Sequence, residues 1–166
     1  MSKTITVGLS NESFEAAAKA LRQYADWVKG KETELRRRLA ERGAEVARIR
    51  FSGANYDGKN DVTVRVDNTG NVAVIYAEGK AVAFIEFGSG AAYGYGHPQA
   101  SEFGVGPGTY SDNEDLGGKH HWAEPDGWYY AHGKRSLGNL PAMAMYDAVQ
   151  AIAESVLEVA REVFST

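Results

Sequence analysis

The side chains that most often carry chemistry gather in one glycine-rich stretch, residues 88–139. All four histidines lie in it, at His97, His120, His121 and His132. A zinc site needs three or four ligands in a recognisable geometry, and the helical HExxH motif is absent. The adjacent pair His120 and His121 is also poorly suited to binding one ion together. We therefore interpret the histidines as loop-packing or surface residues and expect no metal.

Acidic side chains cluster in the same stretch and raise two further possibilities. They are Asp112, Glu114, Asp115, Glu124 and Asp126. The segment SDNEDLGG is similar in composition to a calcium loop but lacks the D-x-[DN]-x-[DN]-G spacing. Two carboxylates beside tryptophans would suit a glycosidase, but no regular element is predicted there to hold them at a fixed separation. We expect no enzyme activity and no cofactor, and a glycan-active enzyme is the alternative.

Glycine motifs in the stretch would suggest phosphate binding if a helix followed them. GSGAAYGYG and GVGPG are the two candidates. A dinucleotide fingerprint or a P-loop needs a strand, a glycine turn and a helix that opens onto the phosphate. No helical pattern follows either motif, and the GK[ST] ending is missing. The sequence therefore predicts no nucleotide site.

Glu86 stands near the end of the apolar run AVAFIEFG, residues 81–88, which we interpret as a strand. If its face is buried, the carboxylate must be hydrogen-bonded or paired, because an isolated buried charge is very costly. The N–H groups of the glycines that follow it are one source of donors. A catalytic role stays open, but we favour a structural carboxylate that fixes the start of the long segment.

The elements that position these side chains follow from periodicity. Ser10 or Asn11 begins a helix with an apolar face at Phe14, Ala17, Leu21, Tyr24 and Val28, and a second stripe follows at Leu35, Leu39, Val46 and Ile49. Gly30 interrupts the pattern, so one bent helix and a helix pair both remain open. Pro141 is predicted to open the last helix. Its expected stripe is Met145, Val149, Ile152, Val156, Val159 and Val163.

Three strands are predicted between the helices, at residues 61–68, 71–79 and 81–88, with a turn at 68–71. Their spacing indicates an antiparallel meander. The fold class is therefore α+β: a small antiparallel sheet, an N-terminal helix or helix pair and a long C-terminal helix packed on it, plus the long aromatic and glycine-rich loop. We expect a single domain over residues 1–166, with 88–139 as its interaction loop.

The composition limits the kinds of partner that we expect for this protein. The 166 residues have a net charge of -4 and contain no cysteine, so neither a nucleic-acid-binding surface nor a disulfide is predicted. The basic run at residues 36–38 is better explained by ion pairs with Glu32, Glu34 and Glu41 on an exposed helix face. No apolar run approaches the roughly 20 residues of a membrane helix, so we expect a soluble protein with no membrane partner.

Aromatic residues in the long stretch supply apolar area that a partner surface can bury. With Glu86 and Phe87, the predicted interaction residues are Tyr93, Tyr95, Phe103, Tyr110, Trp122, Trp128, Tyr129 and Tyr130. A small carbohydrate- or protein-binding module that uses these aromatics as a platform is a further alternative.

Four motifs occur in an order that resembles a known family: VAFIEFGSG, HP, W-x5-W-Y-Y-x-H-G-K and G-N-L-P-A-M-A-M-Y-D-A. They resemble the tail-completion, or head–tail joining, proteins of tailed phages, also called minor capsid proteins. Members carry a strand that ends in EFGTG, here residues 86–90 with Ser89 in place of threonine. They also carry a G-W-x-Y element, here 127–130, and a PA-x-x-M-Y segment, here 141–146. A proline-threonine-glycine element found in many relatives is replaced here by SGANYDGKND.

The resemblance, which runs from about Leu35 to the C-terminus, implies a structural role without catalysis. It implies a subunit of a ring, hexameric in the family, between phage head and tail or in a phage-tail-like particle. The implied partners are further copies and other neck and tail proteins, with DNA only as passing cargo. The implied location is the virion neck or tail, after assembly in the host bacterial cytoplasm. The implied fold is similar to that of tail-terminator proteins, a small sheet flanked by helices.

Overall fold

The fold is α+β, as the sequence predicts. A computed structural model describes residues 4, 6, 8–56, 58–89, 96–103, 128–129, 135–136 and 138–165. The elements in chain order are α1 (Asn11–Ser52), β1 (Thr63–Asp67), β2 (Val74–Glu78), α2 (Val82–Phe87), α4 (Ala100–Phe103), β3 (Trp128–Tyr129), β4 (Arg135–Ser136) and α5 (Ala144–Ser165).

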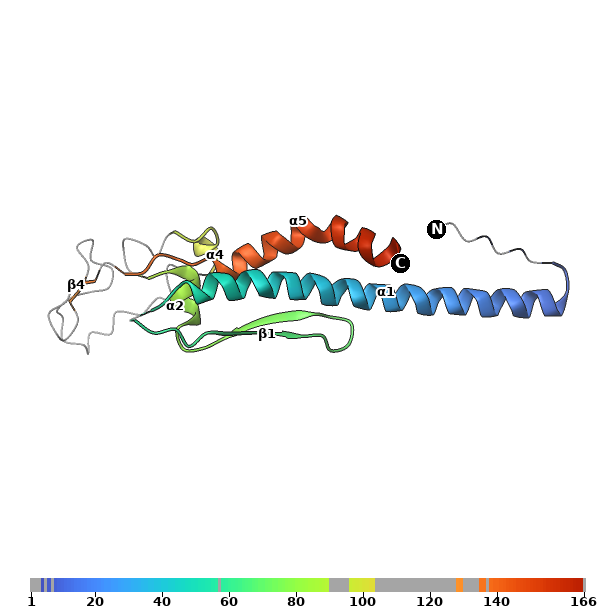
Figure 1. Cartoon of the computed structure of the whole chain (residues 1–166), viewed down its shortest axis with the longest axis horizontal. Coiled ribbons are helices and arrows are strands. Elements are labelled where there is room, and N and C mark those ends of the chain that lie inside the picture. The colour runs from blue at the N-terminus through green and yellow to red at the C-terminus, as the bar shows by residue number, and fades with distance from the viewer. Residues whose placement is uncertain are drawn as a thin grey trace.

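The long helix α1 is the axis of the molecule. α5 lies along one side of it and the β1–β2 hairpin along another (Figure 1). β1 and β2 pair antiparallel, with Thr63 opposite Glu78 and Asp67 opposite Val74. Val64 and Val66 are half-buried while Arg65 is exposed, which confirms the predicted alternation of β1. The C-terminal helix thus packs mainly on α1 rather than on the sheet.

The N-terminal helical region is one continuous helix. The Ser10 side chain accepts a hydrogen bond from the Ser13 N–H at 3.2 Å and caps it, as predicted. Gly30 lies inside α1 and does not end it, because a glycine in a helix costs only about 1 kcal/mol relative to alanine. The arginine run forms the predicted ion pairs, with Glu32, Glu34 and Glu41 at 2.6–2.8 Å.

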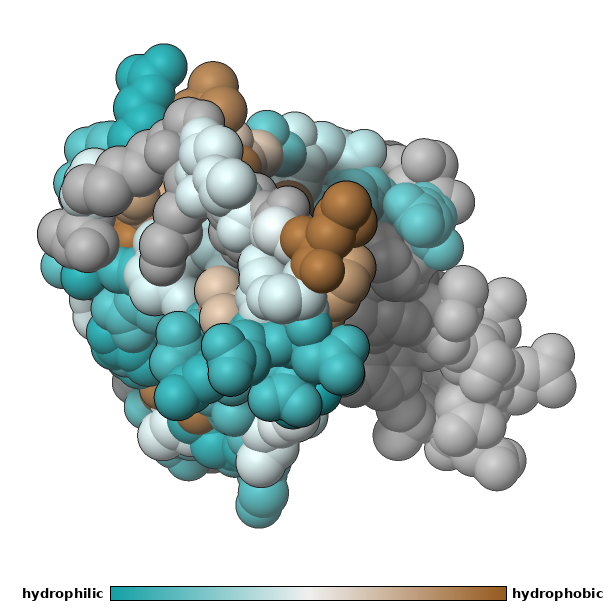
Figure 2. Space-filling view, turned by 90° about the vertical axis from the view of Figure 1, so that its right-hand side faces the viewer, coloured by the Kyte–Doolittle hydropathy of each residue, from teal (hydrophilic) through white to brown (hydrophobic). Residues whose placement is uncertain are grey.

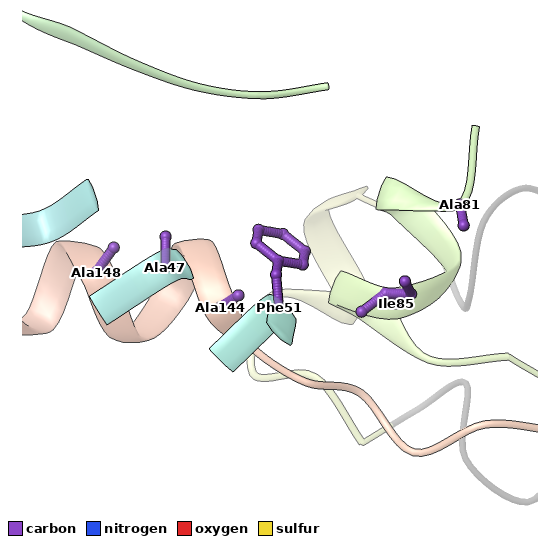
Figure 3. Packing of buried hydrophobic residues seen from close by; sticks show 6 residues of the cluster. All are labelled: Ala47, Phe51, Ala81, Ile85, Ala144 and Ala148. Carbon is purple, nitrogen blue, oxygen red and sulfur yellow. The ribbon is translucent and has the colours of Figure 1, made fainter. Parts of the chain in front are cut away.

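Small residues bring α1 and α5 together. The buried residues of α1 are Ala40, Gly43, Ala44, Ala47 and Phe51, and those of α5 are Ala144, Ala148, Ser155, Val159 and Val163. At the end of α1, Phe51 points into the space between α5 and α2, where Ile85 lies (Figure 3). Helices with alanine and glycine on the facing sides can approach closely, so the core is built on backbone proximity rather than on many large side chains.

The predicted third strand is wrong. Residues 82–87 form the short helix α2, which leaves a two-stranded sheet. A short run that is apolar on both faces cannot be assigned to strand or buried helix by periodicity alone. The helix is favoured here because it places Ala81 and Ile85, four residues apart, in the same core cluster. Gly88 then ends it with a φ of 75°, in the region where glycine is favoured.

The last helix begins later than predicted, and its buried face is rotated. α5 starts at Ala144 rather than Pro141, since Met143 takes a φ of 53° that cannot continue a helix. Val159 and Val163 of the predicted stripe are buried, but Val149 and Val156 are exposed. The spacing of three and four was therefore correct, but the buried face of α5 combines Val159 and Val163 with the small residues Ala144, Ala148 and Ser155.

Candidate functional site

Glu86 lies buried where α2 meets the start of α5, with 5% of its surface exposed. Its Oε2 accepts a hydrogen bond from the Met145 N–H at 2.9 Å, and its Oε1 accepts one from the Tyr146 N–H at 3.0 Å. These N–H groups belong to the first turn of α5, which has no helical acceptor for them. Glu86 therefore caps a helix 59 residues further along the chain. These described donors come from α5, whereas the sequence had suggested the glycines that follow Glu86, of which Gly90 and Gly94 lie outside the described residues.

His97 completes this buried junction. Its Nε2 lies 3.3 Å from Glu86 Oε1, and its Nδ1 accepts a hydrogen bond from the Gln99 N–H at 3.0 Å. Because Nδ1 acts as acceptor, the proton is on Nε2, and a neutral imidazole donates to the carboxylate. The rings of Phe87 and Tyr146 lie 4.5 and 5.7 Å from the imidazole ring. The pair is thus held by packing as well as by hydrogen bonds, which is the structural role we favoured.

The two ends of the long stretch are fastened together beside this junction. Ser89 and Asn139 exchange two backbone hydrogen bonds, at 2.9 and 3.2 Å. The Ala142 N–H donates to the Ile85 carbonyl, and the Met143 N–H donates to the Glu86 carbonyl. Residues 85–89 and 139–143 therefore run side by side. The two ends of the long stretch therefore lie at the same place on the body, next to the start of α5.

The predicted interaction residues are placed unevenly. Glu86 is buried and Phe87 is half-buried against His97, so both serve the protein's own core. Phe103 lies in α4, and Trp128 and Tyr129 lie in β3, where only the backbone is described. The other residues of the prediction lie outside the described residues: Tyr93, Tyr95, Tyr110, Trp122 and Tyr130. Their role as an interaction surface stays a prediction.

Sequence reasoning missed a larger exposed surface, on the first half of α1. This part of the helix extends past the C-terminal end of α5 and past the tip of the hairpin (Figure 1). Its apolar side chains are largely exposed: Phe14 at 55%, Leu21 at 57%, Tyr24 at 44% and Trp27 at 42%. With Val28 and five alanines, they occupy about half of the helix circumference at 100° per residue. We call this surface the α1 face.

A second apolar surface lies on the exposed side of α5, and near the C-terminal end of the helix its Phe164 contacts Trp27 of α1. It comprises Val149, Ala153, Val156, Leu157, Ala160 and Phe164, of which Val149 and Leu157 are the most exposed, at 60% and 70%. We call this surface the α5 face. A hollow of about 390 Å³ lies beside its first turn, between Val149, Met145 and residues of β2 and α2 such as Ala77 and Val82. Viewed from the end at which α1 begins, brown hydrophobic residues interrupt a mainly teal surface (Figure 2).

Two carboxylates of the body, Glu34 and Asp61, form contacts that lower their pKa values. Hydrogen bonds from Arg37 and Arg38 lower the pKa of Glu34 to about 2. The N–H groups of Lys80 and Ala81 donate to the Asp61 carboxylate at 2.8 and 3.1 Å, which lowers the pKa of that carboxyl. The Asp61 contacts hold the turn between β2 and α2, and so fix the helix that carries Glu86.

The described residues set limits on two further kinds of site. Among them, no group of three or more histidine or acidic side chains is placed to hold a metal ion. None of the helices in the described part of the chain is both long enough and apolar enough to cross a membrane. His120, His121 and His132 lie outside the described residues.

Comparisons of this chain with protein-family models, with curated proteins and with solved structures find no match.

Proposed function

We propose that this protein is a structural subunit of the neck of a phage, or of a phage-tail-like particle, that joins or completes the tail by assembling into a ring. The motif order of the sequence suggests the role, and the α1 face is the observation that carries it. The part of α1 before Trp27, the residue that contacts Phe164 near the end of α5, extends past the body (Figure 1), and Phe14 and Leu21 in it are more than half exposed. An exposed apolar surface of this kind is typical of a protein that is buried against another chain.

The junction around Glu86 supports a structural role for the EFGSG motif. Both carboxylate oxygens are occupied by N–H groups of α5, and His97 donates to one of them. A carboxylate used in this way fixes the frame on which the long stretch begins and ends. Glu86 lies in the wall of the 390 Å³ hollow, but its side chain is only 6% exposed. Acid–base catalysis would require its hydrogen bonds to break, because both oxygens already accept hydrogen bonds from the protein. We therefore propose a role without catalysis.

The acidic balance of the chain is compatible with DNA as passing cargo. A net charge of -4 gives no general attraction to the phosphate backbone, so DNA can move through a ring of such subunits without being held. The partners under this proposal are further copies of the chain and the adjoining neck and tail proteins, and its location is the assembled particle.

The experiment that tests the function is disruption of the gene in the parent particle, followed by electron microscopy of the lysate. We expect DNA-filled heads and separate tails that fail to join, and recovery of complete particles when the intact gene is supplied in trans. Complete, infectious particles in the absence of the protein would contradict the proposal. Digestion of cell-wall glycan by the purified chain would favour the enzyme alternative instead, and binding of glycan by a stable monomer would favour the binding module.

A further inference from the structure

The two apolar faces lie on the paired helices α1 and α5, and among the described residues they meet where Trp27 contacts Phe164. α5 reaches back along α1 only as far as Trp27, whose ring lies 6.0 Å from that of Phe164. The α1 face continues beyond that contact, away from α5 (Figure 1). Leu21 at the centre of the α1 face and Val156 at the centre of the α5 face are therefore separated along the helix axis. Among the described residues, the rest of each face stays exposed.

The α1 face and the α5 face match in length and in the spacing of their apolar residues. From Phe14 to Val28 the α1 face spans about 21 Å of helix, and from Val149 to Phe164 the α5 face spans about 22 Å, at 1.5 Å per residue. Both repeat at spacings of three and four residues, the pattern of helices that pack at a shallow angle. Alanines accompany the larger side chains on both faces, as they do in the α1–α5 contact inside the chain.

Charge also permits the contact. The charged residues of the first part of α1 lie on the opposite side from the α1 face; they are Glu12, Glu15, Lys19, Arg22, Asp26 and Lys29. On α5, Glu158 and Glu162 turn toward Arg42 and Arg38 of α1, at 3.3 Å in each case. The exception on α1 is Lys31, whose ammonium lies 5.7 Å from the centre of the Trp27 ring. Packing the two faces together would otherwise bury few charged groups, which limits the desolvation penalty that opposes many interfaces.

We propose that the α1 face of one copy of this chain packs against the α5 face of the next copy. The contact joins two different surfaces and is therefore heterologous, the type that closes into a ring when the rotation between neighbours allows it. This inference rests on the proposed function, since it names the interface through which the ring forms. The hollow beside Val149 receives the end of the incoming helix and extends the buried surface onto β2 and α2.

Cysteine cross-linking tests the contact directly, because the chain contains no cysteine of its own. The variants are Leu21→Cys, Val156→Cys and the double variant, each in the full chain and each at the centre of its face, so the direction of the incoming helix does not matter. Under mild oxidation we expect the double variant to form a ladder of linked oligomers, and each single variant to remain unlinked. Linked dimers from Leu21→Cys alone would show that α1 pairs with itself, and would overturn the inference.

Charge substitution gives a second, independent readout. Leu21→Glu and Val156→Glu are each expected to raise the concentration for half-assembly by at least about tenfold in sedimentation velocity. Gln23→Glu adds the same charge to the polar side of α1 and is expected to have little effect. Circular dichroism verifies that each variant is folded.

Different results would overturn the proposed interface and the proposed neck function. Rings that persist in Leu21→Glu would overturn this interface. A wild-type chain that remains monomeric, together with a double cysteine variant that forms no ladder, would also overturn it. The neck function is judged by the heads and tails of the disrupted particle, whichever surface forms the ring.

Discussion

At the scale of single residues, the buried carboxylate of Glu86 has the largest predicted effect on stability. Glu86→Ala would leave the N–H groups of Met145 and Tyr146 and the ring N–H of His97 without their acceptor. Unsatisfied buried donors are costly, so we expect the free energy of unfolding to fall by about 2–3 kcal/mol in urea denaturation. Glu86→Gln keeps one acceptor oxygen and should lose less.

The matched control for this prediction is Glu154→Ala, which removes an exposed carboxylate from α5. An effect of Glu86→Ala no larger than that of the control would contradict the capping role. Faster hydrogen exchange limited to the first turn of α5 would show a local loss of structure there. That result would agree with the capping role of Glu86.

The lowered pKa of Asp61 predicts how the free energy of unfolding depends on pH. Its pKa is lowered from the ordinary 3.8, mainly by hydrogen bonds from the Lys80 and Ala81 N–H groups. A carboxyl with a lowered pKa in the folded chain stabilises the fold above its unfolded value, and this contribution is lost as the pH falls from 3.8 through the folded value. Asp61→Asn should therefore reduce the loss of stability across that range.

The measurement is the free energy of unfolding of wild type and variant between pH 6 and pH 2. Glu34, with its pKa of about 2, and Glu78, whose pKa Arg65 lowers, contribute to the acid loss in both proteins, so the difference between the two curves is the informative quantity. Parallel curves would show that Asp61 does not act through its charge. Asp26→Asn, on the exposed side of α1, serves as the control.

At the scale of elements, two glycines of α1 should respond oppositely to alanine. A Cβ at Gly43 would lie 2.6 Å from Ile152 Cδ1 and 2.9 Å from Ile75 Cδ1, whereas a Cβ at Gly30 would meet nothing within 4 Å. Gly30→Ala should stabilise the protein by about 1 kcal/mol through helix propensity. Gly43→Ala gains the same propensity, but overpacking of about 1–3 kcal/mol should outweigh it.

Thermal and urea unfolding of the two variants test this prediction. The informative quantity is the sign of the change in the free energy of unfolding. Ile152→Val removes the atom nearest to the new methyl group, so we expect Gly43→Ala to cost less in that background. Equal stabilisation by both alanines would mean that the space between α1, α5 and β2 is looser than the contacts at Gly43 indicate.

At the scale of the whole molecule, we predict uneven protection from hydrogen exchange along α1. Amides of residues 14–26, which lie beyond α5 and the hairpin, should exchange faster than those of residues 40–51 in the core contact, by on the order of tenfold or more. Protection of residues 14–26 should rise with protein concentration if copies assemble through the α1 face. Uniform, concentration-independent protection along the helix would contradict both statements.

The sequence by itself determined the features that depend on neighbours close in the chain. The Ser10 cap, the Arg36–38 ion pairs, the alternation of β1 and the α+β class all follow from spacings within a few residues, and all are confirmed. The helical nature of both terminal regions was equally clear, because a three-and-four spacing was sustained over many residues. Whether Gly30 divides the first region into two helices was left open, and the structure shows one helix.

Only the tertiary structure decided the features that depend on contacts between residues far apart in the chain. Residues 82–87 form a helix because Ile85 is buried against Phe51 and Asp61 holds the turn before it, contacts that no local pattern contains. Glu86 meets its donors 59 and 60 residues away, so its capping role was invisible in the sequence. The exposure of the α1 face was hidden for the same reason. A periodic apolar stripe shows that a helix has something to bury, and the lengths and packing of α1 and α5 decide whether its own chain can bury it.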